Sequence, residues 1–262
     1  MGIRLLAVVS LIFVGCGGSA SRGPKGPDDV AGQGGGGGEG GGAAEGGGGT
    51  SGGEGGAPGT IPEPHVAAPE QHKQLLDNEW VRVYEEKNPS GTKVAMHRHP
   101  DHVAYVMAGS VLQVTTSDGK EETRDLKSGQ SFFFPAEAHR IENTGKNLAV
   151  VILVELKKRG TAAPAGPVTA AAASKIYREA FDHERVRIIE ATFSPGSKVK
   201  ATNHPDAVFY ATTEGKLKMT TAEGTKPVDV QSGMTMFMPA GTFAAQNLGK
   251  TQVRIVMFEL KP

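Results

Sequence analysis

An internal repeat constrains the fold of this chain more than any other feature of its sequence. Val81-Arg82-Val83 recurs as Val186-Arg187-Ile188, at a shift of 105 residues (186 − 81 = 105). After the turns at Asp118-Gly119 and Glu223-Gly224 the shift falls to 104 (239 − 135 = 104). A repeat of this length predicts two copies of one structural unit. The other matched pairs are Gly91 and Gly196, His99-Pro100-Asp101 and His204-Pro205-Asp206, Leu112 to Thr116 and Leu217 to Thr221, Gly129 and Gly233, Pro135 and Pro239, Asn143 and Asn247, and Glu155-Leu156-Lys157 and Glu259-Leu260-Lys261.

The repeat also sets the predicted domain boundaries. We place the two copies at residues 66–158 and 175–262, joined by a linker of Ala, Pro, Gly and Thr at residues 159–174. Residues 16–60 are dominated by glycine and contain almost no large apolar side chain. Such a segment cannot bury enough surface to offset its conformational entropy, so it is predicted to be a disordered tether.

The first fifteen residues have the pattern of an export signal. Arg4 gives a positive start, and Leu5 to Val14 form an apolar stretch that is too short to span a membrane. Phe13-Val14-Gly15-Cys16 resembles the lipobox of bacterial lipoproteins, which implies a signal peptide at residues 1–15 and lipidation of Cys16. The alternative is an ordinary signal peptide with an incidental cysteine. The absence of aspartate after Cys16 implies, by the same resemblance, a cell-envelope protein anchored to the outer membrane.

Charge and cysteine content exclude several classes of protein. Lys+Arg and Asp+Glu both total 28, so the chain has no overall basic character that would favour nucleic acid as a partner. Its single cysteine excludes an intrachain disulfide framework and a cysteine-rich metal cluster. The predicted partners are a small molecule and, through the lipid, a membrane.

Each copy has the pattern of an all-β domain. Val150 to Val154 and Val253 to Phe258 are β-branched or aromatic apolar runs, and Asp118-Gly119 is a strong hairpin signal. Helical periodicity is scarce. Several short strands at close spacing indicate a sandwich or barrel, and a jelly roll avoids long exposed edges.

Two motifs in the first copy resemble those of the cupin superfamily. Gly91 is followed after five residues by His97-Arg98-His99, which resembles the opening of the first cupin motif. Gly129, followed after five intervening residues by Pro135, and then His139 and Asn143 resemble the second motif. The resemblance covers residues 75–158 and again 175–261, and it implies two tandem jelly-roll (double-stranded β-helix) barrels.

The histidines of the first copy predict a metal site. Alternate residues of a strand share one face, so His97 and His99 can both point into the barrel, and His139 would approach from a neighbouring strand. Neutral imidazoles suit a divalent transition metal, here Fe, Mn, Ni, Cu or Zn, and no residue selects among them.

The carboxylate ligand of most metal cupins is missing from its usual place. Those positions are Val103 and Ala104, and His102 lies beside them. Counting from Gly109 makes His102 a further ligand, whereas alignment with the second copy puts Val103 in the ligand slot and His102 on the opposite face. We favour the second register, and His102 stays a candidate ligand. Glu137 is expected to face solvent rather than the pocket mouth, and Asn143 to order a turn.

The second copy has lost the predicted ligands. Thr202 stands at the position of His97 and Phe243 at that of His139, which leaves His204 alone. This barrel is expected to be metal-free, with Phe243 filling the space of a metal. An apolar cavity lined by Phe209, Phe237 and Phe243 is the alternative.

Two functions of different classes fit these patterns. The first is a metal-dependent enzyme acting on a small molecule, of which the resemblance favours a dioxygenase. The second is a non-catalytic cupin lipoprotein that binds a small ligand or has a structural role, favoured by the missing glutamate and the altered second copy. Two fused barrels can make internally the contact that cupins use to dimerise, so both a monomer and a homodimer are consistent with the sequence.

Overall fold

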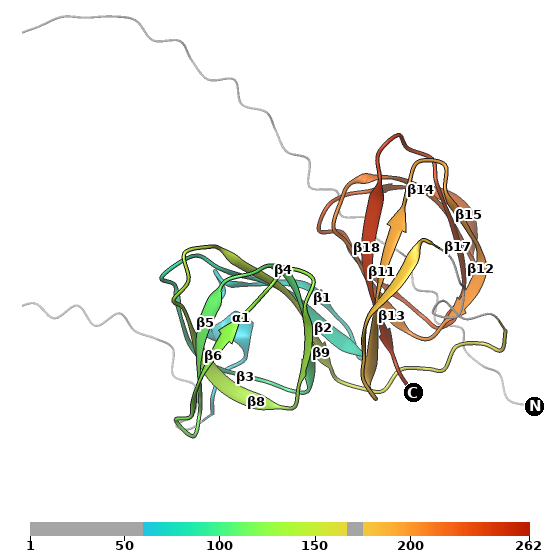
Figure 1. Cartoon of the computed structure of the whole chain (residues 1–262). Coiled ribbons are helices and arrows are strands. Elements are labelled where there is room, and N and C mark those ends of the chain that lie inside the picture. The colour runs from blue at the N-terminus through green and yellow to red at the C-terminus, as the bar shows by residue number, and fades with distance from the viewer. Residues whose placement is uncertain (1–59, 167–174) are drawn as a thin grey trace, which may run out of the picture. The chain divides into compact units, whose positions relative to one another are not determined.

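The computed structural model describes residues 60–166 and 175–262. In these residues the chain forms eighteen strands and one short helix (Figure 1). The predicted signal peptide, Cys16 and the glycine tether lie outside the described residues, as does part of the linker. The described part contains no helix with the length and apolar character needed to cross a membrane.

The elements follow one another in the same order in each copy. The first copy contains α1 (Pro64–Ala67), β1 (His72–Asp77), β2 (Val81–Asn88), β3 (Lys93–His99), β4 (His102–Ala108), β5 (Val111–Thr116), β6 (Glu121–Asp125), β7 (Ser131–Phe134), β8 (Glu137–Asn143) and β9 (Ala149–Leu156). The second contains β10 (Tyr177–Asp182), β11 (Val186–Phe193), β12 (Lys198–His204), β13 (Ala207–Ala211), β14 (Gly215–Thr221), β15 (Gly224–Val230), β16 (Thr235–Met238), β17 (Gly241–Asn247) and β18 (Val253–Leu260).

Each copy is a barrel of two antiparallel sheets. In the first the sheets have the orders β1-β2-β9-β4-β7 and β3-β8-β5-β6, and in the second the orders β10-β11-β18-β13-β16 and β12-β17-β14-β15. The second pair of sheets repeats the first strand for strand. The predicted all-β fold of two tandem jelly-roll barrels is confirmed.

The one-residue change in the repeat shift falls in a hairpin. In the first barrel β5 and β6 are joined through Asp118-Gly119, where Gly119 has a φ of 85°. In the second barrel Thr221 pairs directly with Gly224, so the connection is shorter. Because this hairpin lies at the end of its sheet, its length changes without disturbing the strands on either side.

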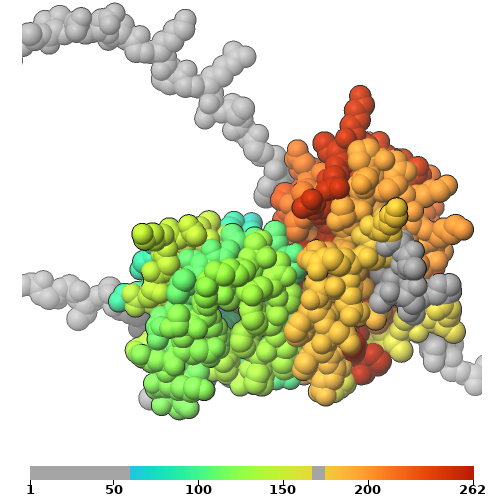
Figure 2. Space-filling view, in the orientation of Figure 1, coloured from blue at the N-terminus to red at the C-terminus, as the bar shows by residue number. Residues whose placement is uncertain are grey.

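Each barrel has its own apolar core between its two sheets. Val94, Leu112, Val114, Val151 and Leu153 belong to the core of the first barrel. The core of the second is larger and includes the aromatic side chains of Phe193, Phe209 and Phe243. Seen from outside, side chains cover most of the face of each barrel that the space-filling view shows (Figure 2).

A third apolar cluster joins the two five-stranded sheets, both of which belong to the compact unit Gly55–Pro262. It contains Val83, Val103 and Val154 from the first barrel, and Ile188 and Phe258 from the second. These residues alternate with those that face the barrel interiors. Strands β9 and β18 are therefore buried on both faces, which explains why their sequences are continuous apolar runs.

Candidate metal centre

Five of the eight histidines lie buried inside the first barrel. Strand β3 contributes two of them, and β1, β4 and β8 contribute one each. All are at most 4% exposed. They are His72, His97, His99, His102 and His139.

Three of these side chains converge on one point. His72, His97 and His99 each offer one ligand atom, and these atoms all lie within 4.8 Å of one another. The ring centroid of His97 is 4.9 Å from that of His72 and 4.9 Å from that of His99. His139 stands opposite His97 in the pairing of β3 with β8, with ring centroids 4.7 Å apart. The predicted pair His97 and His99 is thus joined by His72, and His139 borders the group.

A hydrogen bond holds the Nδ1 atom of each of these four rings. His97 Nδ1 lies 2.7 Å from the Ala95 carbonyl oxygen, and His72 Nδ1 lies 3.2 Å from that of Ala68. The other two rings use carboxylates, at 2.9 Å in each case, with His99 bound to Glu155 and His139 to Glu137. Acceptors at Nδ1 place the proton there and leave the Nε2 lone pair free for a metal, as in most protein metal sites.

Two of the Nε2 atoms have no hydrogen-bond partner. Those of His72 and His97 are buried, and within the described part of the chain neither meets a donor or acceptor. Buried polar atoms are normally satisfied, so such a pair at the meeting point of three imidazoles needs an explanation. A metal ion bound there would provide one, and the donor set fits a divalent transition metal.

The environment keeps three of the histidines neutral. Burial, together with the neighbouring His139, lowers the pKa of His97 to about 4. Burial also lowers the pKa of His102 to about 4 and that of His99 further still. Neutral imidazole is the form that binds a metal, so these side chains are ready to act as ligands at neutral pH without losing a proton.

His102 points into the barrel, contrary to the register favoured from the sequence. With Ala104 and Val106 it lines the interior cavity, whereas Val103 faces the cluster between the barrels. The favoured register is therefore wrong, because the face of β4 that carries Val103 packs against the second barrel and the face that carries His102 packs inside the first. The ring of His102 lies between those of His99, at 4.6 Å, and Phe134, at 5.2 Å. It lies outside the group whose ligand atoms converge.

Sequence reasoning missed His72. This residue precedes the two motifs and lies on β1, which joins the same sheet as β2. One signal was available in the repeat, because the position equivalent to His72 in the second copy is Tyr177 (72 + 105). A histidine that is lost together with His97 and His139 is a candidate for the same site.

Two smaller expectations had different outcomes. Glu137 was expected to face solvent, but its side chain is only 17% exposed. Its carboxylate accepts a hydrogen bond from His139 Nδ1. Asn143 orders a turn, as predicted. Its side-chain oxygen accepts a hydrogen bond from the Gly145 backbone N–H at 3.0 Å, and its amide donates to the carbonyl oxygens of Asn88 and Asn147.

In the second barrel, packing replaces the polar cluster. Phe243 is 2% exposed and makes an edge contact with Phe209, with ring centroids 5.5 Å apart. His204 bonds through Nδ1 to the Pro205 carbonyl oxygen at 2.7 Å. Phe237 lies elsewhere, against Trp80 of the first barrel, so the alternative of a cavity lined by three phenylalanines is wrong.

A cavity of about 40 Å³ adjoins the histidines in the first barrel. The polar residues of its wall are His99, His102, His139, Glu86 and Arg124. The rest of the wall is aliphatic and aromatic. Since one water needs roughly 10–15 Å³, the cavity has room for a few non-hydrogen atoms. The remaining lining residues are Ala104, Val106, Leu112, Val114, Leu126, Phe132, Phe134, Ile141, Val151 and Leu153.

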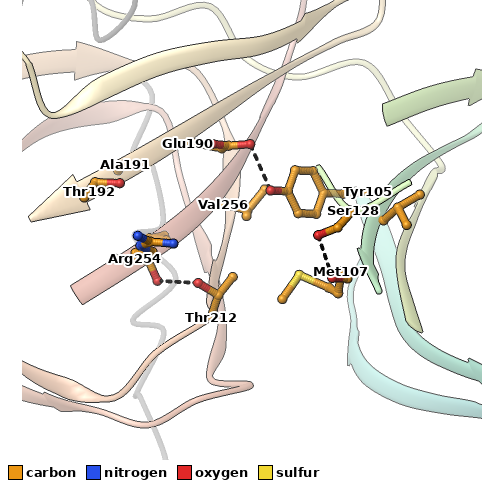
Figure 3. Close-up of a pocket in the computed structure, with 11 residues that line it drawn as sticks. Tyr105, Met107, Ser128, Glu190, Ala191, Thr192, Thr212, Arg254 and Val256 are labelled. Atoms are coloured by element: carbon orange, nitrogen blue, oxygen red, sulfur yellow. Dashed lines mark hydrogen bonds between the residues drawn. The ribbon is translucent and has the colours of Figure 1, made fainter. Parts of the chain in front are cut away.

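A second, larger pocket of about 340 Å³ is lined by residues from both barrels (Figure 3). The Tyr105 hydroxyl donates a hydrogen bond to Glu190 at 2.9 Å across it, and Met107 and Arg254 lie along its walls. None of the five buried histidines lines this pocket. The chemistry of the site therefore belongs to the smaller cavity.

The cupin domain family matches residues 84–155 of the chain. The barrels have the cupin fold. The crystal structure of AerE from Microcystis aeruginosa is similar over 73% of this chain and 97% of its own, with a TM-score of 0.52 and 11% identity. Oxalate decarboxylase from Bacillus subtilis, whose Mn(II) centres have been characterised, is similar over 78% of both chains, with a TM-score of 0.54 and 12% identity. At these identities the likeness extends to the cupin fold alone. No curated protein matches the chain.

Proposed function

We propose that the first cupin barrel binds one divalent transition metal through His72, His97 and His99. The observation that carries this proposal is the pair of buried Nε2 atoms without partners, on His72 and His97, at the point where three imidazoles meet. The Nδ1 hydrogen bonds fix the ring orientations that such a site requires. His139 is the candidate for a further ligand.

We propose further that the site acts on a small molecule that enters the cavity beside the histidines. Three nitrogen ligands leave coordination positions free, where a bound metal would supply Lewis-acid or redox chemistry, including chemistry with dioxygen. The cavity is small and mostly apolar, which favours a compact substrate with few polar groups. His102 and Arg124 line its walls, so they would contact that substrate.

A non-catalytic role is the second candidate. The small volume of the cavity, about 40 Å³, supports it, because little room is left for a substrate beside a metal. In that case the metal would stabilise the barrel or help to hold a small ligand.

The metal of the protein purified from its native host decides between these roles. One metal per chain is expected, and iron would support oxygen chemistry. A redox-inert metal such as zinc, with no dioxygen uptake in the presence of small organic acids, would support the non-catalytic role. Protein that contains no metal and takes up none in dialysis would contradict the proposal.

The placement of the protein in the cell is also a proposal. We infer from the lipobox-like sequence that Cys16 is lipidated and that the barrels are tethered to the cell envelope, at the outer membrane. Cys16→Ser should move the protein from the membrane fraction to the soluble fraction of the envelope. If the variant stays with the membrane, another feature anchors the chain.

A further inference from the structure

A buried carboxylate lies beside the histidine group. Glu86 on β2 is 4% exposed and lines the same cavity as His99 and His139. It stands directly opposite His72 in the pairing of β1 with β2. Opposed residues of an antiparallel pair point to one face, with Cβ atoms about 4.5–5.5 Å apart, so the Glu86 side chain leaves the backbone next to that of His72.

The charge of this carboxylate has no cationic partner. Its Oε1 accepts a hydrogen bond from Asn88 Nδ2 at 2.5 Å, and no Lys or Arg of the described ranges forms an ion pair with it. Val106 and Val151 lie on the neighbouring cavity wall. A buried carboxylate is costly unless it is paired or coordinates a metal.

The second barrel lacks this carboxylate as well as two of the three converging histidines. Ala191 stands at the position of Glu86 (86 + 105), and it pairs with Tyr177, which stands at the position of His72. The position of Asn88, which holds Glu86, is occupied by Phe193 in the apolar core. The acid and its partner are thus present in the barrel that has the histidine group and are replaced by packing residues in the other.

We infer that Glu86 is the oxygen ligand of the metal centre proposed above. It would replace, from β2, the carboxylate that the sequence motif lacks at Val103 and Ala104. Asn88 holds Oε1, and Oε2 would be the donor atom. The Glu86 oxygens lie outside the group of converging ligand atoms, so the side chain would have to turn toward His72, His97 and His99 to bind the metal. A carboxylate added to three imidazoles favours Mn²⁺ and Fe²⁺ over metals that prefer softer ligands.

This inference rests on the proposed metal binding, and the experiment separates the two. The full chain and its Glu86→Gln variant are titrated with Mn²⁺, and their Co²⁺ forms are compared by visible absorption. Glu86→Gln keeps the shape of the side chain and removes its charge. It should weaken Mn²⁺ binding at least about tenfold and change the Co²⁺ spectrum, because an oxygen ligand is lost. Glu142→Gln, on the outer side of β8, is the matched control and should change neither.

Each outcome has a distinct meaning. If the unaltered chain takes up neither metal, the metal centre and this inference both fail. If Glu86→Gln binds Mn²⁺ as tightly as the unaltered chain and has the same Co²⁺ spectrum, the centre stands and Glu86 is not a ligand. Should Glu86→Gln not fold, Glu86→Asp decides, since it keeps the charge and shortens the reach. An unchanged affinity and spectrum in that variant would overturn the inference.

Discussion

The two barrels have the same strands and differ in what their interiors contain. In the first barrel a polar group fills the region where β1, β2, β3 and β8 meet, and in the second the same region is packed with aromatic and small side chains. Because the second barrel keeps the fold without the polar group, the fold itself does not require it. The residues exchanged are His72 for Tyr177, Glu86 for Ala191, His97 for Thr202 and His139 for Phe243.

The largest effect should come from removing the histidines themselves. The double substitution His97→Ala, His99→Ala should reduce the metal content from about one per chain to nearly none, as measured by elemental analysis of the purified protein. His204→Ala, at the position equivalent to His99, should leave the content unchanged. Loss of metal in the His204 variant would mean that the second barrel contributes to binding and that the contrast between the barrels is wrong.

Removing the phenylalanine that fills the second barrel should affect stability instead. Phe243 is 2% exposed in the core, so Phe243→Ala leaves a cavity and should lower the free energy of unfolding by about 3–5 kcal/mol. Chemical denaturation measures the loss. The metal content should stay the same, and a lower content would show that the core of the second barrel supports the site in the first.

Acid should act mainly on the first barrel when no metal is bound. Burial lowers the pKa of His97 and of His102 to about 4, from 6.5, so between these values the unfolded chain binds more protons than the folded chain. Stability is therefore present above pH 6.5 and is lost as the pH falls toward 4. Burial raises the pKa of Glu155 to about 7, which acts in the opposite sense and offsets one histidine. Burial lowers the pKa of His99 as well, which adds to the loss, so the net loss should be at least about 3 kcal/mol.

Thermal unfolding of the metal-free chain between pH 7 and pH 4 tests this expectation. A His97→Leu, His102→Leu variant should lose much less stability across the same range. An equal loss in the variant would place the acid-sensitive groups elsewhere.

A smaller effect should follow from copying one residue of the second barrel into the first. His72→Tyr introduces the residue found at position 177 and removes one ligand, so metal affinity should fall at least about tenfold, or roughly 1.4 kcal/mol. Competition with a chromogenic chelator measures the change. The reciprocal variant Tyr177→His should gain no metal, because Thr202 and Phe243 still occupy the other ligand positions. Unchanged affinity in His72→Tyr would remove His72 from the ligand set.

The fold was accessible from the sequence because the repeat preserves every strand. The shift of 105 residues maps β2 onto β11 and β3 onto β12, and the shift of 104 maps β8 onto β17 and β9 onto β18. The turn made by Asn143 and the inward direction of His97 and His99 also follow from local rules, since a turn residue and strand alternation are short-range properties.

The rest of the site depends on contacts between strands and between barrels. The alternation of polar and apolar residues along one strand cannot show these contacts. In β2 the positions of Val81 and Val83 are apolar and those of Arg82, Tyr84 and Glu86 are more polar, a pattern typical of a strand whose polar face meets solvent. Here the apolar face meets the second barrel, and the polar face turns into the first. For the same reason, His102 on β4 faces the interior of the first barrel, and Val103 faces the second barrel. His72 was missed because its place follows from the register of β1 against β2.

The two five-stranded sheets pack together through apolar outer faces. The chain segment between the barrels therefore does more than connect them. Separated barrels would each expose an adhesive surface, and their association would depend on protein concentration. Within one chain, residues 159–174 keep the two surfaces at a high effective concentration, so that docking is independent of dilution. The second barrel can therefore lose its polar interior and still cover the apolar outer face of the first.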